Sequence, residues 1–181
     1  NYRATLDLGG KATENGKLLY RFNAMYQTAD SHRGNEDAER YGFAPALTYK
    51  LSQKTAVTAE LNVQQAESYM GAAYVFAPND DGYGSLDRDF KFTDTNYPAS
   101  DIQEVTFFGT IKHHFNRDWS WETKFGSLRY DQVGNSTWVW SLEENGDAVR
   151  YISNWDALSV GKYFQSYITG AFHTGSINHN I

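Results

Sequence analysis

Seven stretches of about ten residues alternate apolar and polar side chains, and this alternation most constrains what the chain can fold into. In one of them, Tyr20 and Phe22 would lie on one face of a strand, and Arg21 and Asn23 on the other. Because successive side chains of a β-strand point to opposite faces, a period of two predicts strands. We expect strands over 2–8, 18–28, 41–51, 55–64, 102–115, 119–130 and 161–173, with an eighth beginning at residue 177.

The connections between these stretches are alternately short and long. Short turns are expected near 9–17, 52–54, 116–118 and 174–176, and long connections at 29–40, 65–100 and 131–159. A tilted strand of about ten residues crosses a bilayer, and outer-membrane barrels have short periplasmic turns and long extracellular loops. The pattern therefore predicts an all-β fold, an antiparallel transmembrane β-barrel segment. Within 131–159 we expect a hairpin that turns at 144–147. In the strand over 41–51, Pro45 cannot donate a ladder hydrogen bond, so we expect a bulge or an irregular pairing there.

Composition alone leaves two classes of protein open. With 40% hydrophobic residues, a mean hydropathy of -0.64 and no long apolar run, the chain resembles a soluble protein. However, a barrel strand exposes only every second residue to lipid, and the 16% of aromatic residues suits interfacial girdles. A secreted β-sandwich that binds carbohydrate would also be rich in aromatic residues.

The net charge of -6 without a basic stripe argues against a nucleic-acid partner, and the lack of cysteine excludes disulfides and thiolate metal sites.

Several short sequence segments resemble the early barrel region of TonB-dependent siderophore receptors, and they occur in the same order over essentially the whole chain. The resemblance is greatest to the ferric-hydroxamate branch, whose ligands are ferrichrome- and ferrioxamine-like. The segments are residues 2–10 (YRATLDLGG), 19–24 (LYRFNA), 39–40 (ER), 44–49 (APALTY), 51–52 (LS), 114–120 (HFNRDWS) and 169–177 (TGAFHTGSI).

The resemblance implies further parts of a transport protein beyond residues 1–181. Such receptors have 22 strands around a plugged lumen, and residues 1–181 would form roughly the first third of the barrel. The plug and the segment that engages TonB would precede Asn1. The implied partners are a ferric siderophore, TonB through that missing N-terminal region, and the lipid of the bacterial outer membrane. The ferric siderophore is the ligand, and neither a resident cofactor nor enzymatic activity is expected.

Ligand capture in this family is implied to occur at the extracellular mouth. Aromatic rings in the two longest connections suit a bulky iron chelate, because they offer wide apolar faces together with hydroxyl or N–H donors. The alternative is that these rings pack the loops against themselves or form the outer girdle. The candidate ligand-binding residues are Tyr69, Tyr74, Phe76, Tyr83, Trp138, Trp140 and Tyr151.

No direct metal site is predicted. Two of the five histidines, His113 and His114, are adjacent in a strand and point to opposite faces. Residues 79–82 (NDDG), with Asp87 and Asp89, could suggest a calcium loop, but they lack the ligand spacing and closing glutamate of an EF-hand. A siderophore receptor also binds iron that its chelator already surrounds, so protein ligands to the metal are unnecessary.

The sequence contains none of the motifs that mark common enzyme classes, such as a Gly-x-Ser-x-Gly elbow or a His-Glu-x-x-His zinc site. Instead, alternation places a set of polar residues on the lumenal faces of their strands, where they can hydrogen-bond a plug. A receptor for another cargo, such as cobalamin or a glycan, remains an alternative within the same transport class. The lumenal set is Glu60, Asn62, Gln64, Glu122 and Lys124.

Overall fold

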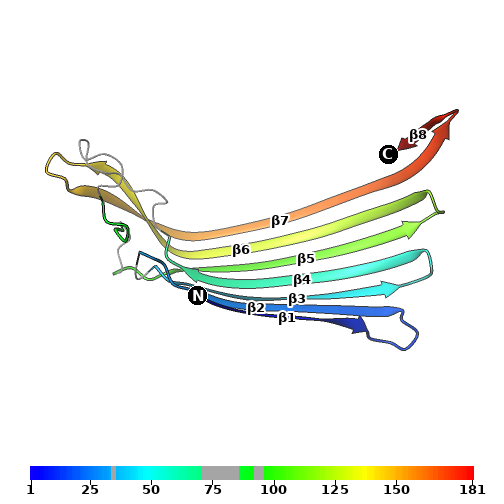
Figure 1. Cartoon of the computed structure of the whole chain (residues 1–181), viewed down its shortest axis with the longest axis horizontal. Helices are drawn as coiled ribbons and strands as arrows, with labels where there is room; N and C mark the ends of the chain where they lie inside the picture. The colour runs from blue at the N-terminus through cyan, green and yellow to red at the C-terminus, as the bar shows by residue number, and fades with distance from the viewer. Residues whose placement is uncertain (34–35, 71–85, 92–95) are drawn as a thin grey trace.

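The computed structural model describes residues 1–33, 36–70, 86–91 and 96–181. These residues form one curved antiparallel sheet in which each strand pairs with the next strand along the chain (Figure 1). The strands are β1 (Tyr2–Lys11), β2 (Leu18–Ala29), β3 (Ala38–Lys50), β4 (Thr55–Ser68), β5 (Ser100–His114), β6 (Trp119–Leu142), β7 (Ala148–Thr174) and β8 (Ile177–Asn180). The predicted all-β fold is confirmed. A β-sandwich needs two sheets packed face to face, whereas the described strands form a single sheet.

The strand register gives the sheet one apolar and one polar face. Leu6, Ala24, Phe43, Val63 and Val105 are successive partners in β1 to β5. The residues one position along each strand point to the opposite face. We call the two sides the apolar face and the polar face. On the polar face lie Asp7, Asn23, Asn62, Thr106 and Lys124.

Aromatic side chains gather near both ends of the apolar face, as they do at the two interfaces of a membrane barrel. Beside the long connections, the Tyr41 hydroxyl donates to Gln65 Oε1 at 2.7 Å, and the Gln65 amide donates to Asp101 at 3.3 Å. At this end of the apolar face, the tyrosine ring is therefore followed across the sheet by polar side chains that hydrogen-bond to one another. The aromatic residues are Tyr2, Tyr26 and Tyr41 at this end, and Tyr20, Tyr49, Phe115, Trp119, Trp121 and Phe172 at the other.

The short turns lie at one end of the sheet and the long connections at the other, as expected (Figure 1). The sixth and seventh strands are longer than predicted, because the ladder continues without a register shift from Trp119↔Gly170 to Val139↔Arg150. The expected excursion over 131–159 is therefore the end of a long β6–β7 hairpin. Its predicted turn is confirmed, with Gly146 at a φ of +88°. No helix among the described residues is long and apolar enough to span a bilayer.

The third strand is irregular at Pro45 but contains no bulge. Its pairing with β4 stops after Phe43↔Val63 and resumes at Ala46↔Glu60 with the register unchanged. Proline has no N–H to donate to the ladder, so pairing lapses locally without an extra residue. On the other side, Pro45 stays in register with Phe22 of β2.

Gly42 allows β3 and β4 to approach closely next to this gap. A Cβ at Gly42 would lie 2.7 Å from the Val63 carbonyl oxygen, which is backbone and cannot rotate away. We expect Gly42→Ala to destabilise the protein by about 1–3 kcal/mol through overpacking. Gly109→Ala is the matched control, because its nearest neighbour would be the Phe107 ring at 3.7 Å. Thermal melting in detergent micelles tests this, and equal melting temperatures for the two variants would contradict the close approach.

Candidate functional site

The β6–β7 hairpin projects beyond the rest of the sheet, and its base is fixed to the start of β5 (Figure 1). Ser100 is fully buried; its hydroxyl donates to the Asn135 carbonyl at 2.9 Å and accepts the Asn135 N–H at 3.1 Å. Gly134 makes this approach possible, since its φ is +152° and a Cβ there would lie 2.4 Å from Ser100 Oγ. The hairpin therefore leaves the sheet from a fixed point.

A second attachment comes from the end of β4. The Thr137 N–H donates to the Met70 carbonyl at 3.1 Å, and the Gln132 amide donates to Met70 Sδ at 3.1 Å. Tyr69, one of the predicted ligand-binding residues, immediately precedes Met70 and is half-buried. The chain that leaves β4 thus crosses the base of the hairpin.

An aromatic cluster occupies the hairpin face that continues the polar face of the sheet. The buried Ser136 hydroxyl oxygen accepts the indole N–H of Trp138 and of Trp155, both at 2.8 Å. Trp138 pairs with Tyr151 across the ladder, and the ring of Tyr151 meets Trp140 edge-on at 5.1 Å. The exposed fractions of Trp138, Trp140 and Tyr151 are 43%, 69% and 53%. Rings held in place yet open to water suit the binding of a large apolar ligand surface.

The structure brings together three of the predicted residues, Trp138, Trp140 and Tyr151. Tyr74, Phe76 and Tyr83 lie outside the described residues. Sequence reasoning did not include Trp155 in the site, although it shares the cluster through Ser136. The sequence gives no signal for this, because the register shifts by one residue between Val139 and Ser141, so counting back from the turn does not yield the observed pairing of Trp155 with Gly134.

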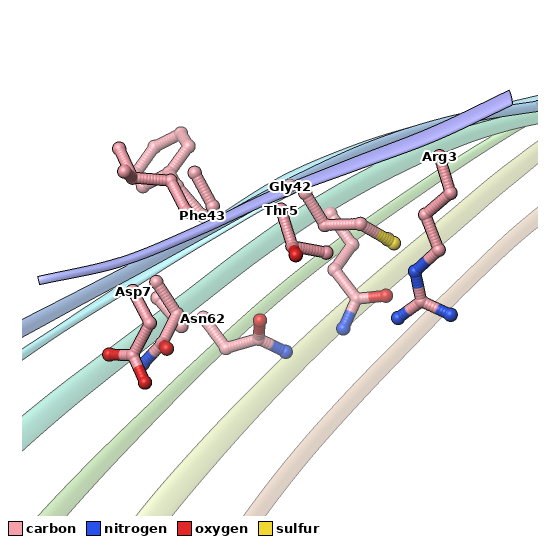
Figure 2. A pocket seen from close by; sticks show the side chains of 12 residues that line it. Arg3, Thr5, Asp7, Gly42, Phe43 and Asn62 are labelled. Atoms are coloured by element: carbon pink, nitrogen blue, oxygen red, sulfur yellow. The ribbon is translucent and has the colours of Figure 1, made fainter.

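The polar face of β1 to β4 is hollowed into a shallow cavity of about 320 Å³. In Figure 2, Thr5, Asp7 and Asn62 point to one side of the sheet, whereas Phe43 points to the other. Gly42 lies on the polar face of β3 and leaves space there because it lacks a side chain. Beside the cavity, Asp7 accepts two hydrogen bonds from the Arg21 guanidinium, at 2.7 and 3.0 Å. Side-chain donors and acceptors line this wall, including Arg3, Asn23, Asn62 and Gln64.

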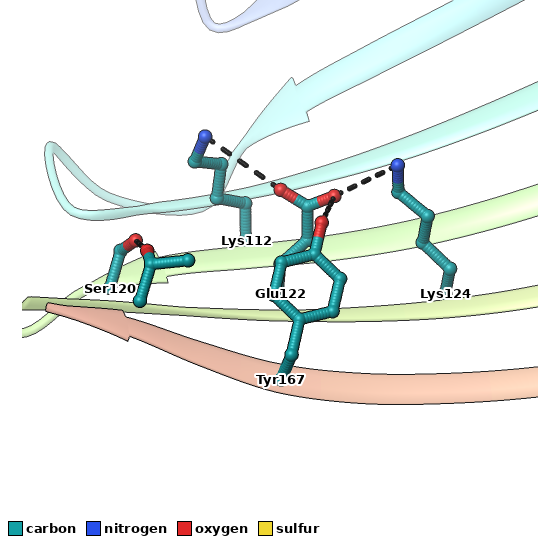
Figure 3. Close-up of polar contacts among 6 residues, drawn as sticks. Lys112, Ser120, Glu122, Lys124 and Tyr167 are labelled. Atoms are coloured by element: carbon teal, nitrogen blue, oxygen red, sulfur yellow. Dashed lines mark hydrogen bonds and ion pairs between the residues drawn. The ribbon is translucent and has the colours of Figure 1, made fainter. Parts of the chain in front are cut away.

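Glu122 is the centre of a charged cluster on the polar face nearer the short turns. Its carboxylate accepts the Tyr167 hydroxyl hydrogen bond at 2.6 Å and contacts Lys124 at 3.0 Å and Lys112 at 3.7 Å (Figure 3). The register confirms that Glu60, Asn62, Gln64, Glu122 and Lys124 share one face of the sheet. Among the residues that the structure describes, no three histidine, aspartate or glutamate side chains gather as a metal site would require.

No protein-family model matches the chain. The chain is 31% identical to the metal-pseudopaline receptor CntO of Pseudomonas aeruginosa, over 99% of this chain and 25% of the receptor. It is 24% identical to the ferrioxamine B receptor of Salmonella typhimurium, over 98% and 26%. It therefore spans about a quarter of the length of the curated relatives it matches.

The sheet also matches part of a solved structure. The ferripyoverdine receptor of the outer membrane of Pseudomonas aeruginosa matches 99% of this chain with a TM-score of 0.75 and 18% identity. The match covers 24% of that receptor. The chain has the fold of a segment of an outer-membrane receptor barrel. In this barrel segment the apolar face is the lipid face and the polar face is the lumenal face.

The relatives do not single out one branch of receptors. Their names specify metal-pseudopaline and ferrioxamine B, and the solved neighbour was bound to ferripyoverdine. The predicted ferric-hydroxamate branch, with its ferrichrome- and ferrioxamine-like ligands, therefore stays a prediction. What the names of these proteins have in common is that each is a receptor for a metal or iron chelate.

The attachment of the hairpin of this barrel segment can be tested at Gly134. We expect Gly134→Ala to loosen the hairpin base, because the new Cβ would collide with Ser100 and the φ of +152° disfavours a side chain. Gly161→Ala is the control, since its Cβ would meet Leu128 at an ordinary 3.8 Å. Limited proteolysis should cleave the hairpin faster in the first variant only. Equal cleavage rates would show that this contact does not hold the hairpin.

Proposed function

We propose that this chain is part of a bacterial outer-membrane receptor that binds ferric siderophores or related metal chelates and imports them with energy supplied through TonB. The observation that carries the proposal is the alternation of a lipid face and a lumenal face along every strand from β1 to β6. Two findings support it, namely the resemblance over 99% of the chain to a metal-chelate receptor and the aromatic hairpin above the sheet.

The hairpin is the part of this chain that first meets the ligand in the proposed mechanism. Ser136 already accepts the N–H groups of Trp138 and Trp155, so these two indoles present their ring faces. The Tyr151 hydroxyl and the Trp140 N–H have no partner among the described residues, so both can hydrogen-bond a chelate. The combination matches the needs of a bulky organic chelate, which has wide apolar surfaces and a few polar atoms.

The lumenal wall has a second role in the proposal. Its hydrogen-bonding side chains, such as Asn62 and Gln64 at the cavity in Figure 2, would contact a plug that fills the lumen. The proton gradient of the inner membrane supplies the energy through TonB, so the chain needs no catalytic residue. The ligand is the ferric siderophore, and no resident cofactor takes part.

A different cargo is the alternative within the same class. Cobalamin and glycans also present large surfaces to aromatic rings, so the hairpin alone does not discriminate among them. The resemblance to receptors named for metal-pseudopaline and ferrioxamine B favours a metal chelate.

The proposal is tested with Trp138→Ala and Trp140→Ala in the complete receptor. Each variant should weaken binding of the receptor's ferric siderophore by about 1–3 kcal/mol, because an aromatic ring that the ligand covers costs more than about 1 kcal/mol of binding when it is truncated. Titration of the purified receptor with a panel of ferric hydroxamate, catecholate and carboxylate chelates measures the affinity. Uptake of radioactive iron by cells with and without TonB tests the coupling, and should be lost without TonB.

Tyr20→Ala is the matched control, because this exposed tyrosine lies on the lipid face near the short turns. It should leave chelate affinity unchanged, and all three variants should assemble as the parent does. Unchanged affinity in both tryptophan variants would remove the hairpin from the site. If no chelate in the panel binds the parent receptor and cobalamin or a glycan does, the cargo assignment is wrong.

A further inference from the structure

A basic recess lies on the lumenal face beside the turn between β3 and β4. Its volume is about 420 Å³. The residues with charged or ionisable side chains that line it are Lys50, Lys54, Lys112 and His114, and no aspartate or glutamate is among the lining residues. The recess lies at the short-turn end of the sheet, which is the periplasmic end in an outer-membrane barrel.

The register explains why this recess exists. Lys50 of β3 and Lys112 of β5 are both partners of Ala56, which lies between them on β4. Two strand spacings separate their backbones by about 10 Å. The small Ala56 side chain leaves open space between two long cationic side chains on one face. Like charges that share a face and a row of a sheet are unfavourable unless another group neutralises them.

The neighbouring side chains neutralise only part of this charge. Glu122 contacts Lys112 at 3.7 Å, but the same carboxylate is closer to Lys124, at 3.0 Å (Figure 3). Lys54 donates from Nζ to the Phe115 carbonyl at 3.1 Å, which leaves its charge uncompensated. Lys50 has no ion pair within the described part of the chain.

This local excess of positive charge contrasts with the whole chain, whose net charge is -6. The acidic residues are therefore concentrated elsewhere, and the recess is a local feature rather than a consequence of composition. A concave site with uncompensated ammonium groups concentrates anions, and lysine binds carboxylate oxygens through charge-assisted hydrogen bonds.

We propose that the recess formed by Lys50, Lys54 and Lys112 around Ala56 is a carboxylate-binding site on the periplasmic end of the lumenal wall. The carboxylate has two possible sources, an acidic side chain of the receptor outside residues 1–181, or a carboxylate of a metal chelate that passes through the lumen. The proposal rests on the barrel segment and on its membrane orientation, and it does not require the aromatic hairpin to be the capture site.

Acetylation of the complete receptor with an amine-reactive ester, followed by mass spectrometry, tests the site. Lys11 is the reference, because it lies on the lumenal face near the same end and is exposed outside the recess. If an acidic side chain of the receptor occupies the site, Lys50 loses reactivity relative to Lys11 without any ligand. If a chelate occupies it, Lys50 loses reactivity only when a carboxylate-type ferric chelate is added.

A carbodiimide, which couples amines to carboxylates in contact, then identifies the occupant. A cross-link from Lys50 to an aspartate or glutamate beyond residue 181 or before residue 1 supports the internal source. A chelate adduct on Lys50 supports the other. The Lys112–Glu122 pair, 3.7 Å apart, is an internal positive control for the coupling.

Lys50→Arg and Lys50→Gln complete the test. The charge-retaining Lys50→Arg variant should keep Lys54 protected against acetylation, whereas Lys50→Gln should expose it. If Lys50 reacts as fast as Lys11 with and without chelate and forms no cross-link, the site does not exist. Chelate affinity is measured on the same samples, so a failure here is distinguishable from a failure of the receptor assignment.

Discussion

The ladder of main-chain hydrogen bonds, kept in one register from strand to strand, is the constraint on which the rest of the structure depends. Because the register between β1 and β6 contains no inserted residue, every second side chain of each strand falls on the same face. A shift of one residue would move a whole strand's apolar side chains into the lumen. The pairing holds even across Pro45, where the ladder bond is missing but the register is not.

The same ladder positions the candidate binding residues at both ends of the barrel segment. Towards the long connections, β6 and β7 continue as a hairpin and arrange Trp138, Tyr151 and Trp155 on the continuation of the lumenal face. Towards the short turns, the lumenal face gathers Lys50 and Lys112 on either side of Ala56. One end thus offers aromatic rings and the other offers cations, on a single continuous surface.

The sequence predicted the strands within the membrane well and the hairpin beyond it poorly, for one physical reason. Inside the bilayer, lipid on one side and a polar lumen on the other enforce the period of two that marks β4 and β5. Beyond the bilayer both faces meet water, so residues 131–137 read as a polar loop although they continue β6. Trp155 was missed because its face depends on the register through the turn, which composition does not reveal.

The most direct test of the account is lipid exposure along β5 of the complete receptor in vesicles. Residues 1–181 contain no cysteine, so a cysteine introduced at each of residues 105–110 in turn is the one position in this segment that a spin label modifies. Labels at the odd-numbered positions should collide mainly with oxygen dissolved in lipid. Labels at the even-numbered positions should collide mainly with a water-soluble nickel complex. Uniform accessibility, or lipid contact at the even-numbered positions, would contradict the division into a lipid face and a lumenal face.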